Sequence, residues 1–107
     1  DRIAPLDFFV VRADRLFFQD LGLRHDLYEG EPRYRARVRG VDADRDGEHA
    51  AWADLDDTSV ALDLAGRPAP FVEVEVQVDR GDGFGPSVRC YVASASGRVV
   101  EVQRDRD

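Results

Sequence analysis

The stretch GVDADRDGEH holds the residues whose types and spacing come nearest to a metal site. Asp42, Asp44 and Asp46 occupy alternate positions, and Gly47 follows directly. Calcium binds oxygen ligands, and a glycine lets a loop bend sharply around the ion. The spacing therefore predicts a calcium loop in which these three carboxylates and the main-chain carbonyl of Glu48 are the ligands.

The first half of this loop resembles the calcium loop of an EF-hand. The second half departs from that pattern, because Ala53 stands where an EF-hand has its bidentate glutamate, and the preceding RYRARVRG is typical of a strand. Calcium takes about six to eight oxygens, so Asp54, Asp56 or Asp57 must fold back to complete the site. Without them the stretch is a solvated turn rich in aspartate, and this is the interpretation that we expect.

The two histidines, His25 and His49, offer a different chemistry. Each stands beside an acidic residue, Asp26 or Glu48, and such a histidine can act as an acid or a base. Neither belongs to a known catalytic or ligand motif. Cys90 is the only cysteine, which excludes an internal disulfide and favours a reducing compartment such as the cytoplasm. A small enzyme using His25 or His49 is therefore an alternative that ranks below a role without catalysis.

Length and charge limit the remaining classes of function. The 107 residues, 43% of them apolar, predict one domain over residues 1–107, with the closing RDRD as a frayed tail. A net charge of -7 and a pI near 4.7 argue against nucleic acid and anionic membranes as partners. The longest apolar run, Phe8 to Val11, is far shorter than the roughly 18 to 20 residues that span a bilayer.

The segments that would position the candidate site residues can be predicted from the sequence pattern. From Tyr34 onward, apolar and polar residues alternate along the chain, which is typical of half-buried strands. The predicted strands are RYRARVRGV (33–41), Ser59 to Leu64, FVEVEVQVD (71–79), SVRCYVA (87–93) and RVVEVQ (98–103). The turn-rich RGDGFGP and SASG segments predict hairpin connections. We expect the first and third of these strands to be neighbours, with arginines lying across from Glu73, Glu75 and Asp79 as exposed ion pairs.

The segment 5–21 fits two structures. It can form a helix with one apolar stripe, or a hairpin in which FFVV and LFF flank the turn RADR. The hairpin is favoured, because the helix would leave several large apolar side chains on its polar side. Phe8, Phe9, Phe17 and Phe18 would then point to both faces of their strands. One face needs a cover, so these four residues are predicted to contact a second layer or a partner.

The sequence thus predicts a mainly β fold, a single small antiparallel sandwich or barrel of about six or seven strands. An α+β roll with an N-terminal helix packed on an antiparallel sheet is the alternative. The predicted function is a non-catalytic binding or structural module of a larger protein or assembly, with a protein partner or a second copy of itself. A calcium-binding module and a small enzyme are the competing functions.

Overall fold

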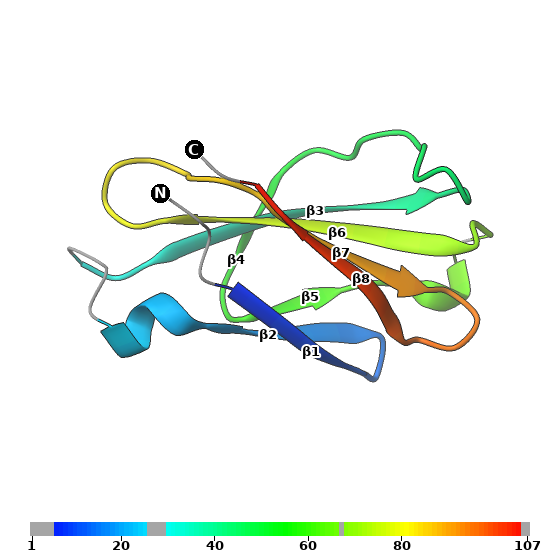
Figure 1. Ribbon diagram of the computed structural model, residues 1–107, viewed down its shortest axis with the longest axis horizontal. Coiled ribbons are helices and arrows are strands. Elements are labelled where there is room, and N and C mark those ends of the chain that lie inside the picture. The colour runs from blue at the N-terminus through cyan, green and yellow to red at the C-terminus, as the bar shows by residue number, and fades with distance from the viewer. Residues whose placement is uncertain (1–5, 26–29, 67, 106–107) are drawn as a thin grey trace.

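The computed structural model describes residues 6–25, 30–66 and 68–105, except the side chains of Phe9, Arg24 and His25. These residues form eight strands in two antiparallel sheets and no α-helix (Figure 1). The three-stranded sheet has the order β1 (Leu6–Arg12), β2 (Arg15–Asp20), β5 (Ser59–Ala61). The five-stranded sheet has the order β4 (Ala53–Leu55), β3 (Arg33–Val41), β6 (Phe71–Asp79), β7 (Val88–Ala93), β8 (Val99–Arg104). Two 3-10 helices, η1 (Leu21–His25) and η2 (Leu64–Gly66), follow β2 and β5.

The mainly β prediction is confirmed, and the alternative with an N-terminal helix is wrong. The described chain has eight strands rather than six or seven, because β4, with only three residues, is too short to show an alternating pattern. The strand expected over Ser59 to Leu64 ends at Ala61. At the C-terminus, Arg104 belongs to β8 and Asp105 N donates a hydrogen bond to Ser87 O, so the first two residues of the expected tail are part of the fold. Arg106 and Asp107 lie outside the described residues.

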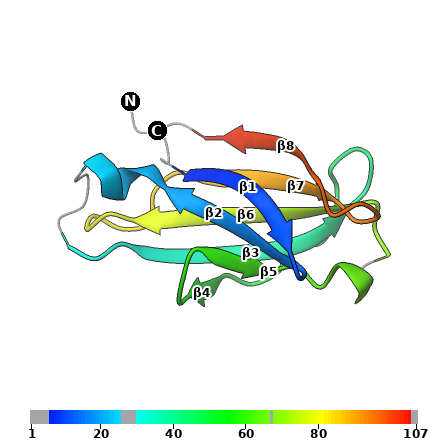
Figure 2. The same ribbon diagram turned by 90° about the horizontal axis from the view of Figure 1, so that it is seen from below.

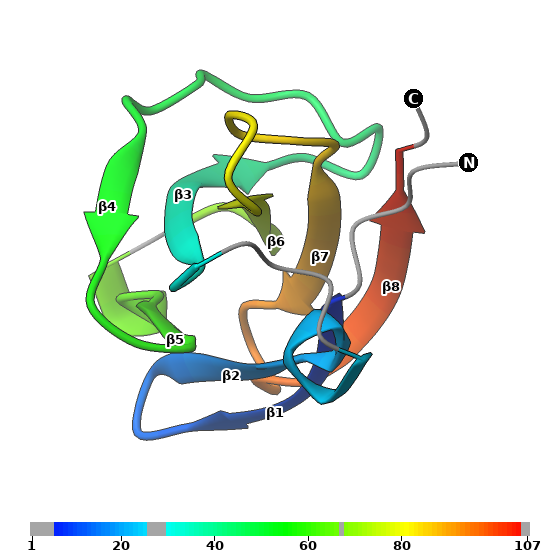
Figure 3. The same ribbon diagram turned by 90° about the vertical axis from the view of Figure 1, so that its left-hand side faces the viewer.

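The two sheets lie face to face as the layers of a sandwich (Figure 2 and Figure 3). Apolar residues from every second position of the long strands face the space between the layers, as the pleat of a strand requires. The buried core comprises Leu6, Leu16, Phe18, Tyr34, Ala36, Val60, Leu62, Val72, Val74, Val76, Val78, Val88, Cys90 and Val92. No helix among the described residues is long and apolar enough to cross a membrane.

The N-terminal hairpin turns at Ala13 and Asp14, which have positive φ angles of 51° and 57°. The flanking pair Arg12 and Arg15 closes a two-residue loop. Positive φ at both loop residues is the type I′ turn, whose twist matches that of the paired strands. Further along β1 the register shifts between Phe8 and Val10, which leaves the intervening residue as a β-bulge.

Replacing Ala13 by asparagine and Asp14 by glycine is expected to stabilise the fold. Residues other than glycine and asparagine adopt the left-handed conformation at a cost, and Asn-Gly is the sequence that a type I′ turn favours. We expect the free energy of unfolding to rise by about 1 kcal/mol, measured by urea denaturation. The control is Ala13→Val, whose branched side chain should lower that free energy. An equal response to both changes would contradict the turn geometry.

The arginines of β3 lie across from acidic or amide residues of β6, as the sequence predicts. The register pairs Arg33 with Asp79, Arg35 with Gln77, Arg37 with Glu75 and Arg39 with Glu73. The expectation that these pairs are exposed is wrong for two of them, because Glu73 and Glu75 are only 2% and 4% exposed. The centre of the outer face of this sheet therefore carries buried ion pairs, formed by Glu73 and Glu75 with arginines of β3.

Aromatic residues of two loops contact the arginines of β3. Between β3 and β4, the ring of Trp52 lies 4.6 Å from the Arg35 guanidinium and 4.5 Å from that of Arg37. Between β6 and β7, the centre of the Phe84 ring lies 4.2 Å from the same Arg35 guanidinium. In contacts of this kind the positive charge of the arginine is attracted to the face of the ring. Glu75 is bonded to Arg37, which Trp52 contacts, whereas Glu73 is bonded to Arg39 and to the hydroxyl of Tyr91.

The two sides of the sandwich differ in how the edges of the sheets are closed (Figure 3). On one side lie β1 and β8, each with a β-bulge, the one in β8 at Val100. Arg104 spans these two strands, since its Nη2 donates to Leu6 O at 2.8 Å and to Asp7 Oδ1 at 2.9 Å. Bulges and charged side chains are devices that keep an edge strand from pairing further. On the other side lie β3, β4 and β5.

Candidate functional site

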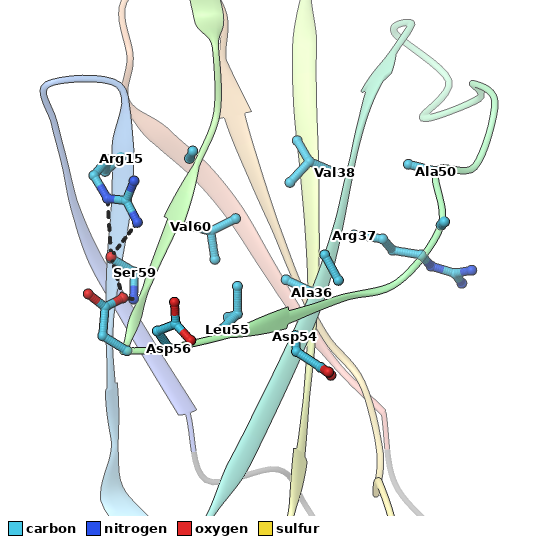
Figure 4. A pocket seen from close by; sticks show the side chains of 14 residues that line it. Arg15, Ala36, Arg37, Val38, Ala50, Asp54, Leu55, Asp56, Ser59 and Val60 are labelled. Carbon is cyan, nitrogen blue, oxygen red and sulfur yellow. Dashed lines mark hydrogen bonds between the residues drawn. The ribbon is translucent and has the colours of Figure 1, made fainter.

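A groove of about 470 Å³ lies between β3 and β5, on the side of the sandwich away from β8 (Figure 4). Its apolar surface comes from both sheets, with Ala36 and Val38 on β3, Leu55 on β4 and Val60 on β5. Figure 4 shows β4 crossing one end of it. The groove is also lined by residues with short side chains, namely Ala50, Ala51 and Ala53.

The groove exists because two strand edges stay unpaired. β4 pairs with β3 only at Tyr34, Arg35 and Ala36, so β3 from Arg37 onward has no strand on this edge within the described chain. β5 pairs with β2 and with no other described strand. Neither of these pairings contains a register shift, whereas both strands on the opposite side carry a bulge. The unpaired part of β3 at Arg37 and Val38 and the unpaired edge of β5 therefore face one cavity.

The direction of the main-chain groups of β5 follows from its pairing with β2. Phe18 N donates to Thr58 O at 3.0 Å, and Leu62 N donates to Asp14 O at 2.8 Å. In an antiparallel pair the main-chain groups of successive residues point alternately to the partner strand and away from it. Ser59 and Ala61 lie between these bonded positions, so their main-chain groups point away from β2, toward the open edge.

Among the described residues, only one of these main-chain groups of Ser59 and Ala61 forms a hydrogen bond. Ser59 N donates to Asp57 Oδ1 at 3.0 Å. The carbonyl of Ser59 and both the N–H and the carbonyl of Ala61 have no protein hydrogen-bond partner in the described part of the chain. The edge of β5 thus presents two acceptors and one donor in the order that an added strand would need.

A polar cluster fixes the β5 wall of the groove. Arg15 donates to Ser59 Oγ from Nε at 3.2 Å and from Nη2 at 2.9 Å, and Ser59 Oγ donates to Asp57 Oδ1 at 2.7 Å. The hydrogen bonds from Ser59, helped by the charge of Arg15, lower the pKa of Asp57. Asp57 is therefore ionised at neutral pH and is held in place by its two bonds to Ser59.

Two further carboxylates flank β4 on opposite sides. Both residues line the groove. In Figure 4 the Asp56 carboxylate lies on the same side of β4 as Val60, and the Asp54 carboxylate lies on the opposite side. Both residues are exposed, and within the described residues neither has an ion-pair or hydrogen-bond partner. The groove therefore has an uncompensated negative charge at the end that β4 crosses.

The aspartates of the predicted calcium loop organise a turn. Asp42 Oδ1 accepts hydrogen bonds from the main-chain N–H of Asp44 at 2.8 Å and of Asp46 at 3.0 Å. The same turn places the Arg45 guanidinium 4.3 Å from the ring of Phe71. Among residues 6–25, 30–66 and 68–105, no group of three or more histidine, cysteine or acidic side chains is arranged to hold a metal ion. Calcium binding by Asp42, Asp44, Asp46 and Glu48 stays a prediction.

The other residues singled out from the sequence lie apart from the groove. His49 is exposed, with its Nε2 3.4 Å from Arg39 Nη1, and the side chain of His25, which lies in η1, is outside the described residues. Cys90 lies in the core, where burial raises the pKa of its thiol to about 12. At neutral pH this thiol is protonated, so the residue acts in packing.

The aromatic residues predicted to contact a layer or a partner have different positions. Phe18 is 2% exposed in the core, and Phe8 is half-buried with its ring centroid 5.6 Å from that of Phe18. Phe17 is half-buried on the outer face, where it lines a shallow hollow with Val10. The side chain of Phe9 lies outside the described residues. The second sheet therefore supplies the cover for the face that carries Phe8 and Phe18.

From the sequence, Asp56 was expected only as a possible further ligand of the calcium loop, and Ser59 and Ala61 were not expected to belong to a site. The available signal was the segment AAWADLDDTS, in which small residues precede a run of acidic ones just before a short strand. Comparison of the chain with known protein families, with curated proteins and with solved structures finds no match.

Proposed function

We propose that this protein is a non-catalytic binding module that accepts an extended segment of a protein partner in the groove between β3 and β5. The observation that carries this proposal is the open edge of β5, where the main-chain groups of Ser59 and Ala61 face the cavity without protein partners. A strand added to such an edge gains affinity from main-chain hydrogen bonds and specificity from its alternate side chains.

The dimensions and surface of the groove fit this role. A cavity of about 470 Å³ is within the range of small binding sites in proteins, roughly 300–1,000 Å³. Its apolar surface at Val38, Leu55 and Val60 would contact the inward side chains of the added strand. Each net main-chain hydrogen bond contributes about 0.5–1.5 kcal/mol. Binding by a short segment is therefore expected to be weak and reversible.

The contrast between the two sides of the sandwich also supports the proposal. β1 and β8 carry bulges and are spanned by Arg104, and such features prevent further pairing. The side at β3 and β5 lacks a bulge in either described pairing. Protection of the edges on one side and its absence on the other favour the groove as the place where a partner strand would bind.

The test is a titration with a synthetic peptide of about six residues, a usual strand length, in which valine and threonine alternate. Backbone amide resonances of the protein are followed by NMR. We expect the resonances of Ser59 to Ala61 and of Arg37 to Val41 to shift. Ala61→Pro, which removes the N–H that faces the groove, should weaken binding by about tenfold or more, while Ala61→Ser, which keeps it, should not.

Proline is tolerable at this position because the Ala61 N–H takes no part in the pairing with β2. Circular dichroism of both variants establishes that they fold. Shifts confined to β1 and β8, or equal binding by the proline and serine variants, would show that the segment binds elsewhere.

A further inference from the structure

We infer that the segment accepted in the groove is basic, with a lysine or arginine placed against Asp56 at the end that β4 crosses. This inference rests on the function proposed above and adds the chemistry of the partner. It is carried by three features of the described residues, namely the free carboxylate in the groove, the engaged state of the nearby arginines, and the apolar surface between them.

The two arginines that line the groove, Arg15 and Arg37, already interact with other residues of this chain. Arg37 Nε donates to Glu75 Oε1 at 2.7 Å, and its guanidinium lies 4.5 Å from the ring of Trp52. Arg15 donates twice to Ser59 and stands near Asp57. Arg37 is thus paired with Glu75, and the charge of Arg15 acts on the neighbouring Asp57 carboxylate. Asp56, in contrast, has no ion-pair partner among the described residues, so the charge left for a ligand to neutralise is negative.

Position along the groove gives the order of side chains in the partner. The added strand would pair with β5 at Ser59 and Ala61, and its side chains would alternate between the groove and solvent. The middle of the groove offers Val38 and Val60, which suit an apolar side chain. Asp56 lies at the end next to β4 (Figure 4). The expected segment therefore has an apolar residue at its centre and a basic residue near one end.

The charge of the whole chain selects the same partner. With a net charge of -7, the protein attracts basic segments and repels acidic ones. A second copy of this chain has the same net charge and is disfavoured as the occupant for that reason. The groove is thus assigned to a basic segment of a different protein, and self-association is an outcome that the experiment below can detect.

The test compares three peptides that share the valine and threonine alternation and differ at one end, which carries lysine, threonine or glutamate. Exposed charge pairs contribute about 0.2–1 kcal/mol, which corresponds to an affinity difference of up to about fivefold. We expect the lysine peptide to bind about threefold to fivefold more tightly than the threonine peptide, and the glutamate peptide more weakly than either. The affinities come from NMR titration of the Ser59 and Ala61 amides.

Asp56→Asn and Asp54→Asn form the matched pair of variants, because the two carboxylates lie on opposite sides of β4 (Figure 4). Asp56→Asn should abolish the preference for lysine, and Asp54→Asn should retain most of it. Salt at about 0.5 M should reduce the preference in the parent protein, because an exposed pair is screened.

Each result bears on one of the two proposals. Equal affinity of the lysine and threonine peptides would overturn the basic partner while leaving strand addition in place. A lysine preference that only Asp54→Asn removes would overturn the placement of the basic residue against Asp56. If no peptide shifts the β5 amides, the proposed function itself is wrong. A dimer in sedimentation velocity whose formation is blocked by Ala61→Pro would assign the groove to a second copy and overturn the basic partner.

Discussion

Reversing the charge of Glu75 with Glu75→Arg is expected to lower the free energy of unfolding by about 3–5 kcal/mol, the cost of leaving buried charges without their partner. Glu75 is 4% exposed, accepts hydrogen bonds from Arg37 and Ser87, and has the Arg89 guanidinium at 3.9 Å. An arginine at this position would place a third positive charge between Arg37 and Arg89. Urea denaturation followed by circular dichroism measures the loss.

A second change tests whether the loss comes from this pair. Adding Arg37→Glu to Glu75→Arg restores opposite charges across the β3 and β6 register, so part of the stability should return. The matched control is Glu101→Arg, opposite Arg45, since the Glu101 side chain is 40% exposed and its loss should stay below about 1 kcal/mol. Additive effects of the two changes at Glu75 and Arg37 would contradict a direct contact.

The same carboxylate sets a pH dependence. Burial raises the pKa of Glu75, but the hydrogen bonds from Ser87 and Arg37 and the charges of Arg37 and Arg89 outweigh it, so the pKa lies below its ordinary value of 4.5. A lowered pKa in the folded state contributes stability above the unfolded-state pKa, and this contribution is lost as the pH falls through the folded value. The stability difference between the parent and Glu75→Gln should therefore narrow below about pH 4.5.

Phe18→Ala is expected to lower the free energy of unfolding by about 3–5 kcal/mol, as for a buried phenylalanine whose removal leaves a cavity. The ring of Phe18 on β2 contacts Phe8 on β1 and, edge to face at 5.6 Å between centroids, Tyr34 on β3. It therefore joins the two sheets. Tyr34 is also tied to β2, because its hydroxyl donates to Asp20 Oδ2 at 2.7 Å.

The neighbouring residue provides the control. Phe17 is half-buried on the outer face of the same strand, so Phe17→Ala removes less buried surface and should cost about 1 kcal/mol. Thermal and urea unfolding of both variants give the comparison. Similar losses from Phe17→Ala and Phe18→Ala would mean that the two rings do not face opposite sides of β2.

The long strands could be predicted from the sequence because each has a strict alternation over nine residues, and β3 and β6 have the bounds that the pattern indicates. The N-terminal hairpin was ambiguous because the β-bulge after Phe8 breaks the alternation of its apolar residues. β4 was not predicted, because it has only three residues and its place beside β3 depends on tertiary contacts. The burial of Glu73 and Glu75 could not be predicted, since the groups bonded to them, such as Arg39, Tyr91 and Ser87, come from other parts of the chain.

The candidate site was harder to predict than the strands. A strand pattern gives the two faces of a strand but not which of its edges remains unpaired, and the groove depends on the edges of β3 and β5. Asp56 has an exposed carboxylate like those of Asp42 and Asp44, and only its place beside the cavity distinguishes it. The aspartate spacing at Asp42 was visible at once, yet its carboxylate holds main-chain amides of its own loop.

The hydrogen bonds from Arg104 to the start of β1 have a consequence for how this fold can be combined with other proteins. Because Arg104 contacts Leu6 and Asp7, the last strand of the fold ends where the first begins. A host chain could enter and leave the fold at one point on its surface, so the fold is suited to insertion into a surface loop of another domain without separating the two ends of that loop.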